Sequence, residues 1–262
     1  MPLLTVNNAL LLFKIHEQIA CISQGHRNIS SSNLPTIILF PSFVISTSIK
    51  KVSTMNKLFF RPWVGSAYAT GGIFGKRVMI LGESHYCEEG CEDCGNARLH
   101  PECCAFTNGV VSDYLNEALD RQRWMSTYLK FERSLIGHET DWTERHRIWN
   151  SVVFYNYLQA AMGGPREAGT TDQYEEAAES FFEVLEKYRP QYVIVWGSRL
   201  WGYMPAGKRW SWNADIVVDG NVNKCGNYAL SDGTKVKIMP VNHPSVGYSW
   251  DYWHRVIAAF LG

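Results

Sequence analysis

The chain lacks a net charge, because its 25 Lys and Arg residues balance 25 Asp and Glu residues. This balance argues against a strongly basic nucleic-acid-binding protein and against an acidic tail. The chain also lacks an apolar run of about 20 residues, which is the length that a membrane span requires. It contains no positively charged segment followed by a signal-peptide core. We therefore expect a cytoplasmic protein without a membrane partner.

Residues 1–54 lack Trp, Tyr and Asp, and Glu17 is their single acidic residue. Every Trp lies after Met55, in a region where 21 basic and 24 acidic residues leave a net charge of −3. We interpret residues 1–54 as a poorly specified N-terminal extension, with Met55 as a natural start and an upstream start codon as one possible origin of the extension. An interfacial or targeting role for this extension is the alternative. Residues 55–262 are then the folded domain.

Apolar runs alternate with amphipathic segments from residue 77 onward. The apolar runs predict buried parallel strands at Arg77–Leu81, Ser151–Tyr155, Tyr192–Gly197 and Val236–Val241. The amphipathic segments predict helices over Val111–Ile136, Asp141–Ile148, Asp172–Lys187, from Ser198 onward, and over Trp250–Leu261. Residues 206–235 read as irregular or hairpin-like, with turns at Asp219-Gly220 and Asp232-Gly233. This order predicts an α/β fold, a three-layer α/β/α sandwich with a four-stranded parallel sheet.

Two polar motifs directly follow the first and the last predicted strand. Gly82-Glu83-Ser84-His85-Tyr86 follows the first, and Asn242-His243-Pro244-Ser245 follows the last. Polar residues just past the carboxyl ends of parallel strands converge on one crevice, where open α/β sheets bind their ligands. The sequence therefore predicts a site at this edge of the sheet.

These motifs resemble those of the uracil-DNA glycosylase superfamily, which has one motif after its first strand and a His-Pro-Ser motif after its last. Val152–Asn156 resembles the strand that ends in the base-reading Asn, and Phe106 lies at about the position of the Phe that stacks on the base. The resemblance covers roughly residues 75–262. It implies excision of uracil or another deaminated base from DNA by hydrolysis of the N-glycosidic bond. It also implies a monomer that binds DNA and needs no cofactor for the chemistry.

The chemistry of this bond cleavage gives each candidate residue a role. Negative charge develops on the departing base, and His243 can supply the donor that stabilises it, while Glu83 and Ser84 can orient water. An extruded base needs an aromatic face and a hydrogen-bonding edge, for which Phe106 and Asn156 are the candidates. The bulk of Tyr86 can exclude a base with a 5-methyl group. Two further motif residues, Gly82 and Ser245, complete the expected substrate-binding set.

The sequence also departs from the superfamily pattern. Ser84 stands where the most active branch has its catalytic Asp, and His85 stands where the first motif has Pro. Val246-Gly247 replaces the Pro-Leu wedge that fills the vacated base stack. These departures keep open an alternative, a non-catalytic nucleobase or nucleic-acid binding module with the same fold.

Five of the seven cysteines lie between Cys87 and Cys104. Clustered thiolates on short loops suit zinc or an iron–sulfur cluster. The candidate ligands are Cys87, Cys91, Cys94 and Cys103, with Cys104 as the alternative fourth. Such a metal would fix the loop between Tyr86 and Phe106. Unbound thiols, a redox disulfide and a radical enzyme that uses S-adenosylmethionine are the alternatives, and a metal-thiolate protein centred on this cluster is a third functional class.

Overall fold

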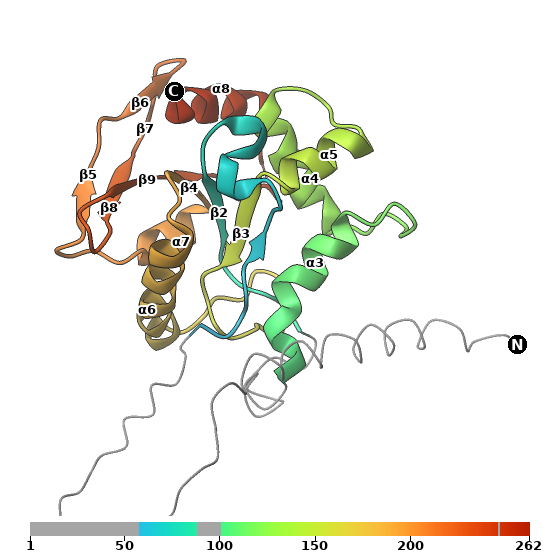
Figure 1. The fold of residues 1–262 in the computed structure, drawn as a ribbon, viewed down its shortest axis with the longest axis horizontal. Coiled ribbons are helices and arrows are strands. Elements are labelled where there is room, and N and C mark those ends of the chain that lie inside the picture. The colour runs from blue at the N-terminus through green and yellow to red at the C-terminus, as the bar shows by residue number, and fades with distance from the viewer. Residues whose placement is uncertain (1–57, 88–100, 246) are drawn as a thin grey trace, which may run out of the picture. The chain divides into compact units, whose positions relative to one another are not determined.

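A seven-stranded sheet organises the residues that this computed structural model describes, namely 58–87, 101–245 and 247–262 (Figure 1). The strand order is β1-β3-β2-β4-β9-β8-β5. The four central strands run parallel to one another: β3 (Val152–Asn156), β2 (Val78–Gly82), β4 (Tyr192–Trp196) and β9 (Lys235–Val241). Three antiparallel strands flank them: β1 (Trp63–Val64), β8 (Gly226–Ala229) and β5 (Trp210–Trp212). The sheet is therefore mostly parallel.

The sheet is larger than the four strands that we predicted. Two of the additional strands, β5 and β8, come from residues 206–235, where the short strands alternate with turns and leave no long apolar run. The third, β1, is only two residues long, which is too short for a periodic pattern. The two predicted turns are present. Asp219-Gly220 joins β6 (Ile216–Val218) to β7 (Asn221–Asn223), and Asp232-Gly233 joins β8 to β9.

Helices cover both faces of the sheet because side chains of its strands alternate between two apolar clusters. On β2, Val78 and Ile80 face one cluster, whereas Met79 and Leu81 face the other. The first cluster also takes side chains from α3 (Phe106–Tyr114), α4 (Met125–Ile136), α5 (Trp142–Trp149) and α8 (Trp250–Leu261). The second takes side chains from α6 (Thr171–Tyr188) and α7 (Ser198–Tyr203) (Figure 1). Three short 3-10 helices complete the described elements: η1 (Tyr68–Thr70), η2 (Gly72–Phe74) and η4 (Pro101–Ala105).

Two helix predictions need correction. The helix predicted over Val111–Ile136 is two helices, because α3 ends at Tyr114 and α4 begins at Met125. In the turn that separates them, the Asn116 side chain accepts the Ala118 N–H at 3.1 Å. The helix predicted over Asp172–Lys187 runs over Thr171–Tyr188, and its capping box is formed by Thr170, directly before the helix, and Gln173. The predicted bounds of α8 are confirmed.

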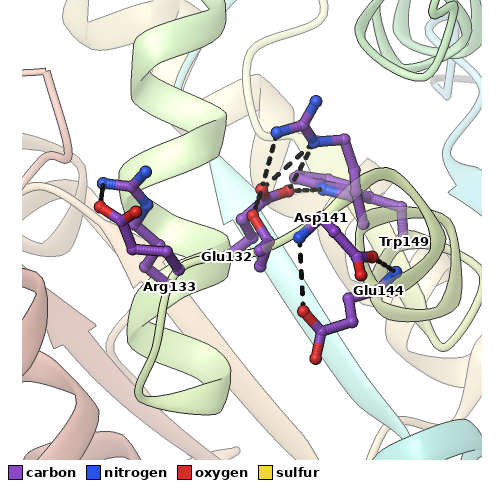
Figure 2. Close-up of polar contacts among 8 residues, drawn as sticks. Glu132, Arg133, Asp141, Glu144 and Trp149 are labelled. Atoms are coloured by element: carbon purple, nitrogen blue, oxygen red, sulfur yellow. Dashed lines mark hydrogen bonds and ion pairs between the residues drawn. The ribbon is translucent and has the colours of Figure 1, made fainter.

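A buried ion pair joins α4 to α5 within the first helical layer (Figure 2). The Glu132 carboxylate is fully buried and lies 3.2 Å from the Arg145 guanidinium. It also accepts hydrogen bonds from the Trp149 indole at 3.2 Å and from the Thr140 hydroxyl. Trp149 in turn packs edge-on against Phe154 of β3, with 5.8 Å between ring centroids. The pair therefore fixes the helices that support the strand ending in Asn156.

Candidate functional site

The carboxyl ends of β2 and β3 lie side by side, with Gly82 paired to Asn156 in the parallel register. A Cβ atom on residue 82 would lie 2.1 Å from Oδ1 of Asn156, which is closer than any non-bonded contact allows. Gly82 is thus the residue that lets the Asn156 amide lie against the first motif. The resemblance implied that both residues bind the substrate, and the structure brings them together.

The loop that follows β2 runs along the loop that follows β3. The N–H groups of Tyr157 and Leu158 donate to the carbonyl oxygens of Gly82 and Glu83, at 3.0 and 2.9 Å. Further along, Met162 donates to the His85 carbonyl at 2.8 Å and accepts from the Cys87 N–H at 2.9 Å. The backbone of the first motif is therefore held in place along its length.

Glu83 is held by two residues that the sequence analysis did not single out. Nε of Arg199 lies 2.7 Å from Oε1 of Glu83, and the Tyr174 hydroxyl donates to the same oxygen. Burial, followed by the neighbouring Glu83, raises the pKa of Tyr174, so this hydroxyl keeps its proton. The Glu83 side chain is only 10% exposed. Arg199 lies three residues past the carboxyl end of β4. The expectation that polar residues just past the ends of parallel strands form the site, which identified Glu83, therefore also applies to Arg199.

The Arg199 guanidinium is itself anchored. Its Nη1 and Nη2 donate to the carbonyl oxygens of Arg166 and Glu167, at 3.0 and 3.2 Å. All three of its nitrogens therefore have acceptors, and the planar fork cannot rotate without losing hydrogen bonds. The Glu83 carboxylate is consequently oriented and largely shielded from bulk water.

His243 lies in the loop after β9 and is partly buried against Trp196, with 6.1 Å between ring centroids. Its Nδ1 accepts the backbone N–H of Ser245 at 3.3 Å and lies 2.8 Å from the Ser245 hydroxyl. Because a backbone N–H only donates, the proton of the neutral ring lies on Nε2. Burial lowers the pKa of His243, Glu83 opposes this shift, and Arg199 adds to it. His243 therefore lies within electrostatic reach of the Glu83–Arg199 pair and offers a neutral N–H donor.

Phe106 and Asn156 are also brought together, but the His85 imidazole fills the space between them. The imidazole stacks on Phe106, with 4.5 Å between centroids and 10° between planes. The Asn156 amide nitrogen lies 3.1 Å from its Nδ1, and the Thr107 hydroxyl lies 2.8 Å from its Nε2. The edge of the Phe60 ring closes another side at 4.9 Å. We call the space bounded by Phe60, Phe106, Thr107 and Asn156 the aromatic slot.

Two motif residues lie beside this slot. Tyr86 is 45% exposed, and its hydroxyl accepts the Arg166 N–H. Burial, followed by the nearby Glu83, raises the pKa of Tyr86. Ser84 is half-buried between Glu83 and His85. A ring of the size of Tyr86, exposed next to Glu83, is placed to limit what approaches the carboxylate.

The predicted metal ligands fall partly outside the described residues, since Cys91 and Cys94 belong to the segment 88–100. Cys87 and Cys103 are half-buried and pack on the same small apolar cluster, which contains Phe60 and Ala161. Within 58–87, 101–245 and 247–262, no three His, Cys, Asp or Glu residues are grouped to hold a metal. The zinc or iron–sulfur site stays a prediction, which elemental analysis of anaerobically purified protein tests.

A cavity of about 270 Å³ lies next to Asn242, the first residue of the second motif. Its lining includes Asn242, Ser198, Trp201 and Trp253, and it does not include Phe106 or Asn156. This cavity and the aromatic slot are therefore separate features. Among the helices that the structure describes, none is long and apolar enough to cross a membrane.

No protein-family model matches this chain, and no curated protein matches it in sequence. The function must therefore be argued from the residues of the crevice.

Proposed function

We propose that this protein hydrolyses the N-glycosidic bond of uracil or another deaminated base in DNA. The observation that carries the proposal is the Glu83–Arg199 ion pair just past the carboxyl ends of β2 and β4, with His243 just past the carboxyl end of the next strand, β9. The four central parallel strands, covered by helices on both faces, support a uracil-DNA glycosylase-like fold for this domain.

The anchored Glu83 carboxylate suits the positive charge that develops on the sugar as the bond breaks. Water adds its oxygen to the anomeric carbon, the carbon–nitrogen bond breaks, and the base leaves with the bonding electron pair. A fixed carboxylate stabilises the oxocarbenium-like state without reorganising, and this preorganisation is the main source of electrostatic catalysis. Ser84, which follows Glu83, can hydrogen-bond the incoming water. The substitution of Ser for Asp at this position leaves Glu83 as the carboxylate of the motif.

His243 suits the opposite charge on the departing base. Its Nε2–H is a neutral donor, held in that tautomer by Ser245. A neutral imidazole can donate to the carbonyl oxygen of the base, where the negative charge collects, before the base takes a proton from solvent. The Nδ1 contact with Ser245 thus gives the second motif a positioning role.

One observation favours the competing function, a non-catalytic nucleobase or nucleic-acid binding module. The aromatic slot, where a flipped base would stack, is filled by His85. In addition, Arg209 and Arg255 form ion pairs with Glu186 and Asp219, which weakens their attraction for phosphate. A binding module would bind a nucleobase or nucleic acid at this site without cleaving the N-glycosidic bond.

An oligonucleotide assay separates the two functions. The purified chain is incubated with end-labelled DNA that contains a single uracil, in single-stranded and duplex forms, and abasic sites are then cleaved with alkali. Strand cleavage at the uracil supports the glycosylase. Intact strands with a uracil-dependent mobility shift support the binding module. Intact strands without a shift contradict both, and a matched thymine oligonucleotide controls for nuclease contamination.

A further inference from the structure

His85 is the one residue of the first motif whose side chain is almost fully buried, at 4% exposure. Its imidazole is a flat nitrogen heterocycle that lies in the aromatic slot as a ligand would. One face stacks on Phe106, and the edge of Phe60 closes the slot from a second direction. Stacking at 4.5 Å with nearly parallel planes is a favourable aromatic geometry.

Both ring nitrogens of His85 have polar contacts within the aromatic slot. The Asn156 amide nitrogen, which only donates, lies 3.1 Å from Nδ1 and 3.2 Å from Nε2 of His85, and the Thr107 hydroxyl lies 2.8 Å from Nε2. The slot therefore holds a planar nitrogen heterocycle, bound by an amide donor, a hydroxyl group and one aromatic face.

The contacts that hold His85 divide between its backbone and its side chain. The backbone carbonyl accepts the Met162 N–H at 2.8 Å and is part of the ladder that fixes the motif. Among the residues that the structure describes, the side chain is bound through the slot residues Phe60, Phe106, Thr107 and Asn156. Rotation about the side-chain bonds would therefore vacate the slot and leave the motif backbone in place.

We propose that His85 is a displaceable internal occupant of the aromatic slot, which competes with a nucleobase for Phe106 and Asn156. This inference rests on the proposed function, in that it gives the same site a residue that controls access. A base must displace the imidazole before it can stack, so the apparent affinity is reduced by the fraction of molecules in which the slot is open. Bases that leave a DNA stack readily, such as mismatched or unpaired ones, are then favoured over paired ones.

The first consequence concerns an emptied slot. A His85→Ala variant should bind free 4-methylimidazole, which has the shape and the hydrogen-bonding groups of the missing side chain. Buried cavities made by truncating a side chain do bind small molecules of matching shape. With ligand at about ten times its Kd, the melting temperature of the variant should rise by about 3–5 °C. The wild-type protein should show no such rise.

Two controls make this measurement specific. Toluene has a similar size but no nitrogen. If hydrogen bonds contribute to binding in the slot, toluene should bind more weakly than 4-methylimidazole. His138→Ala removes an exposed histidine that pairs with Glu144 on the surface, and it should behave as the wild type does. A His85→Ala variant that is folded by circular dichroism yet unaffected by 4-methylimidazole would overturn the inference. Equal stabilisation of wild type and variant would do the same.

The second consequence concerns the base itself. His85→Ala should bind free uracil about tenfold or more tightly than the wild type, because no competitor has to leave. Calorimetry measures this without requiring excision. If neither protein cleaves uracil-containing DNA while the variant gains affinity for 4-methylimidazole and uracil, the glycosylase proposal fails and the occupant inference stands. If the wild type cleaves but the variant gains no affinity, the inference fails and the glycosylase proposal stands.

Truncation of a buried ring can prevent folding, so a measurement on the wild type keeps the inference testable. Ring protons of His85 should resonate upfield, because they lie over the face of Phe106. If neither His85→Ala nor His85→Ser folds, excess uracil is added to the wild type labelled at histidine. Movement of the His85 signals toward their unstacked positions supports displacement, and unchanged signals contradict it.

Discussion

Nε of Arg199, in the first turn of α7, lies 2.7 Å from Oε1 of Glu83, in the loop after β2. These residues are 116 positions apart and follow two neighbouring parallel strands. The same guanidinium also binds the backbone carbonyls of Arg166 and Glu167. A carboxylate fixed in this way keeps one orientation, which is what stabilisation of a developing charge requires.

The first prediction is the pH dependence of excision. Burial lowers the pKa of His243 below 6.5, so the ring stays neutral as the pH falls from the alkaline side through 6.5. If the neutral donor is the active form, the single-turnover rate should not decline until the pH passes below the lowered pKa. Histidine NMR should find that Arg199→Ala raises the pKa of His243 and that Glu83→Gln lowers it further, because their charges act in opposite directions. A decline of the rate centred above 6.5 would contradict the role of the neutral ring.

A second prediction concerns the donor itself. His243→Ala should reduce the single-turnover rate about 100-fold or more, because one charge-stabilising donor is lost. His138→Ala serves as the matched control, since His138 is exposed and pairs with Glu144. Ser245→Ala removes one of the contacts that hold the tautomer, so it should have a smaller effect. Equal rates for His243→Ala and His138→Ala would contradict a catalytic role for His243.

Acid sensitivity provides a third prediction. The pKa of His85 is about 3 in the folded protein and near 6.5 when the chain is unfolded, so the unfolded state binds more protons between these values. The stability that His85 contributes is therefore fully present above pH 6.5 and is lost as the pH falls toward 3. Urea unfolding of the wild type should lose up to about 1.4 kcal/mol per pH unit more than His85→Gln does. Parallel curves for the two proteins would mean that His85 is not buried in solution.

The close approach of β2 and β3 leads to a fourth prediction. Gly82→Ala should displace the Asn156 amide, because the new methyl group would lie 2.1 Å from Oδ1. Both base binding and stability should fall. Gly109→Ala is the control, since a Cβ there meets nothing within 4 Å and the residue is helical. That substitution should stabilise the protein by about 0.5–1 kcal/mol, and the comparison is made by urea unfolding together with the binding assay.

The fifth prediction concerns the supporting layer shown in Figure 2. Glu132→Gln leaves the half-buried Arg145 guanidinium without its counter-charge and should cost about 3 kcal/mol of unfolding free energy. Glu139 pairs with Arg133 but is 75% exposed, so Glu139→Gln should change the unfolding midpoint little. Equal midpoints for the two variants would show that the buried pair contributes no more than the surface pair.

Much of the architecture was predictable because it follows from local patterns. Val78–Leu81 and Tyr192–Trp196 are continuous apolar runs, as strands buried on both faces require. The amphipathic spacing of Trp250–Leu261 located α8. By contrast, β5 and β8 are short strands at the antiparallel side of the sheet, and their pairing depends on β9, which lies later in the chain. No local pattern marks such strands.

The sequence by itself determined where the polar groups stand, because the length of each apolar strand sets the residue that comes just past its end. Gly82, Asn156 and His243 were identified for that reason. Only the tertiary structure decided which side chains meet there. Arg199, which follows β4, pairs with Glu83, which follows the neighbouring strand β2. The imidazole of His85 lies in the slot between Phe106 and Asn156. Such contacts join residues that are distant in the chain, so their geometry exists only once the sheet and its helices have packed.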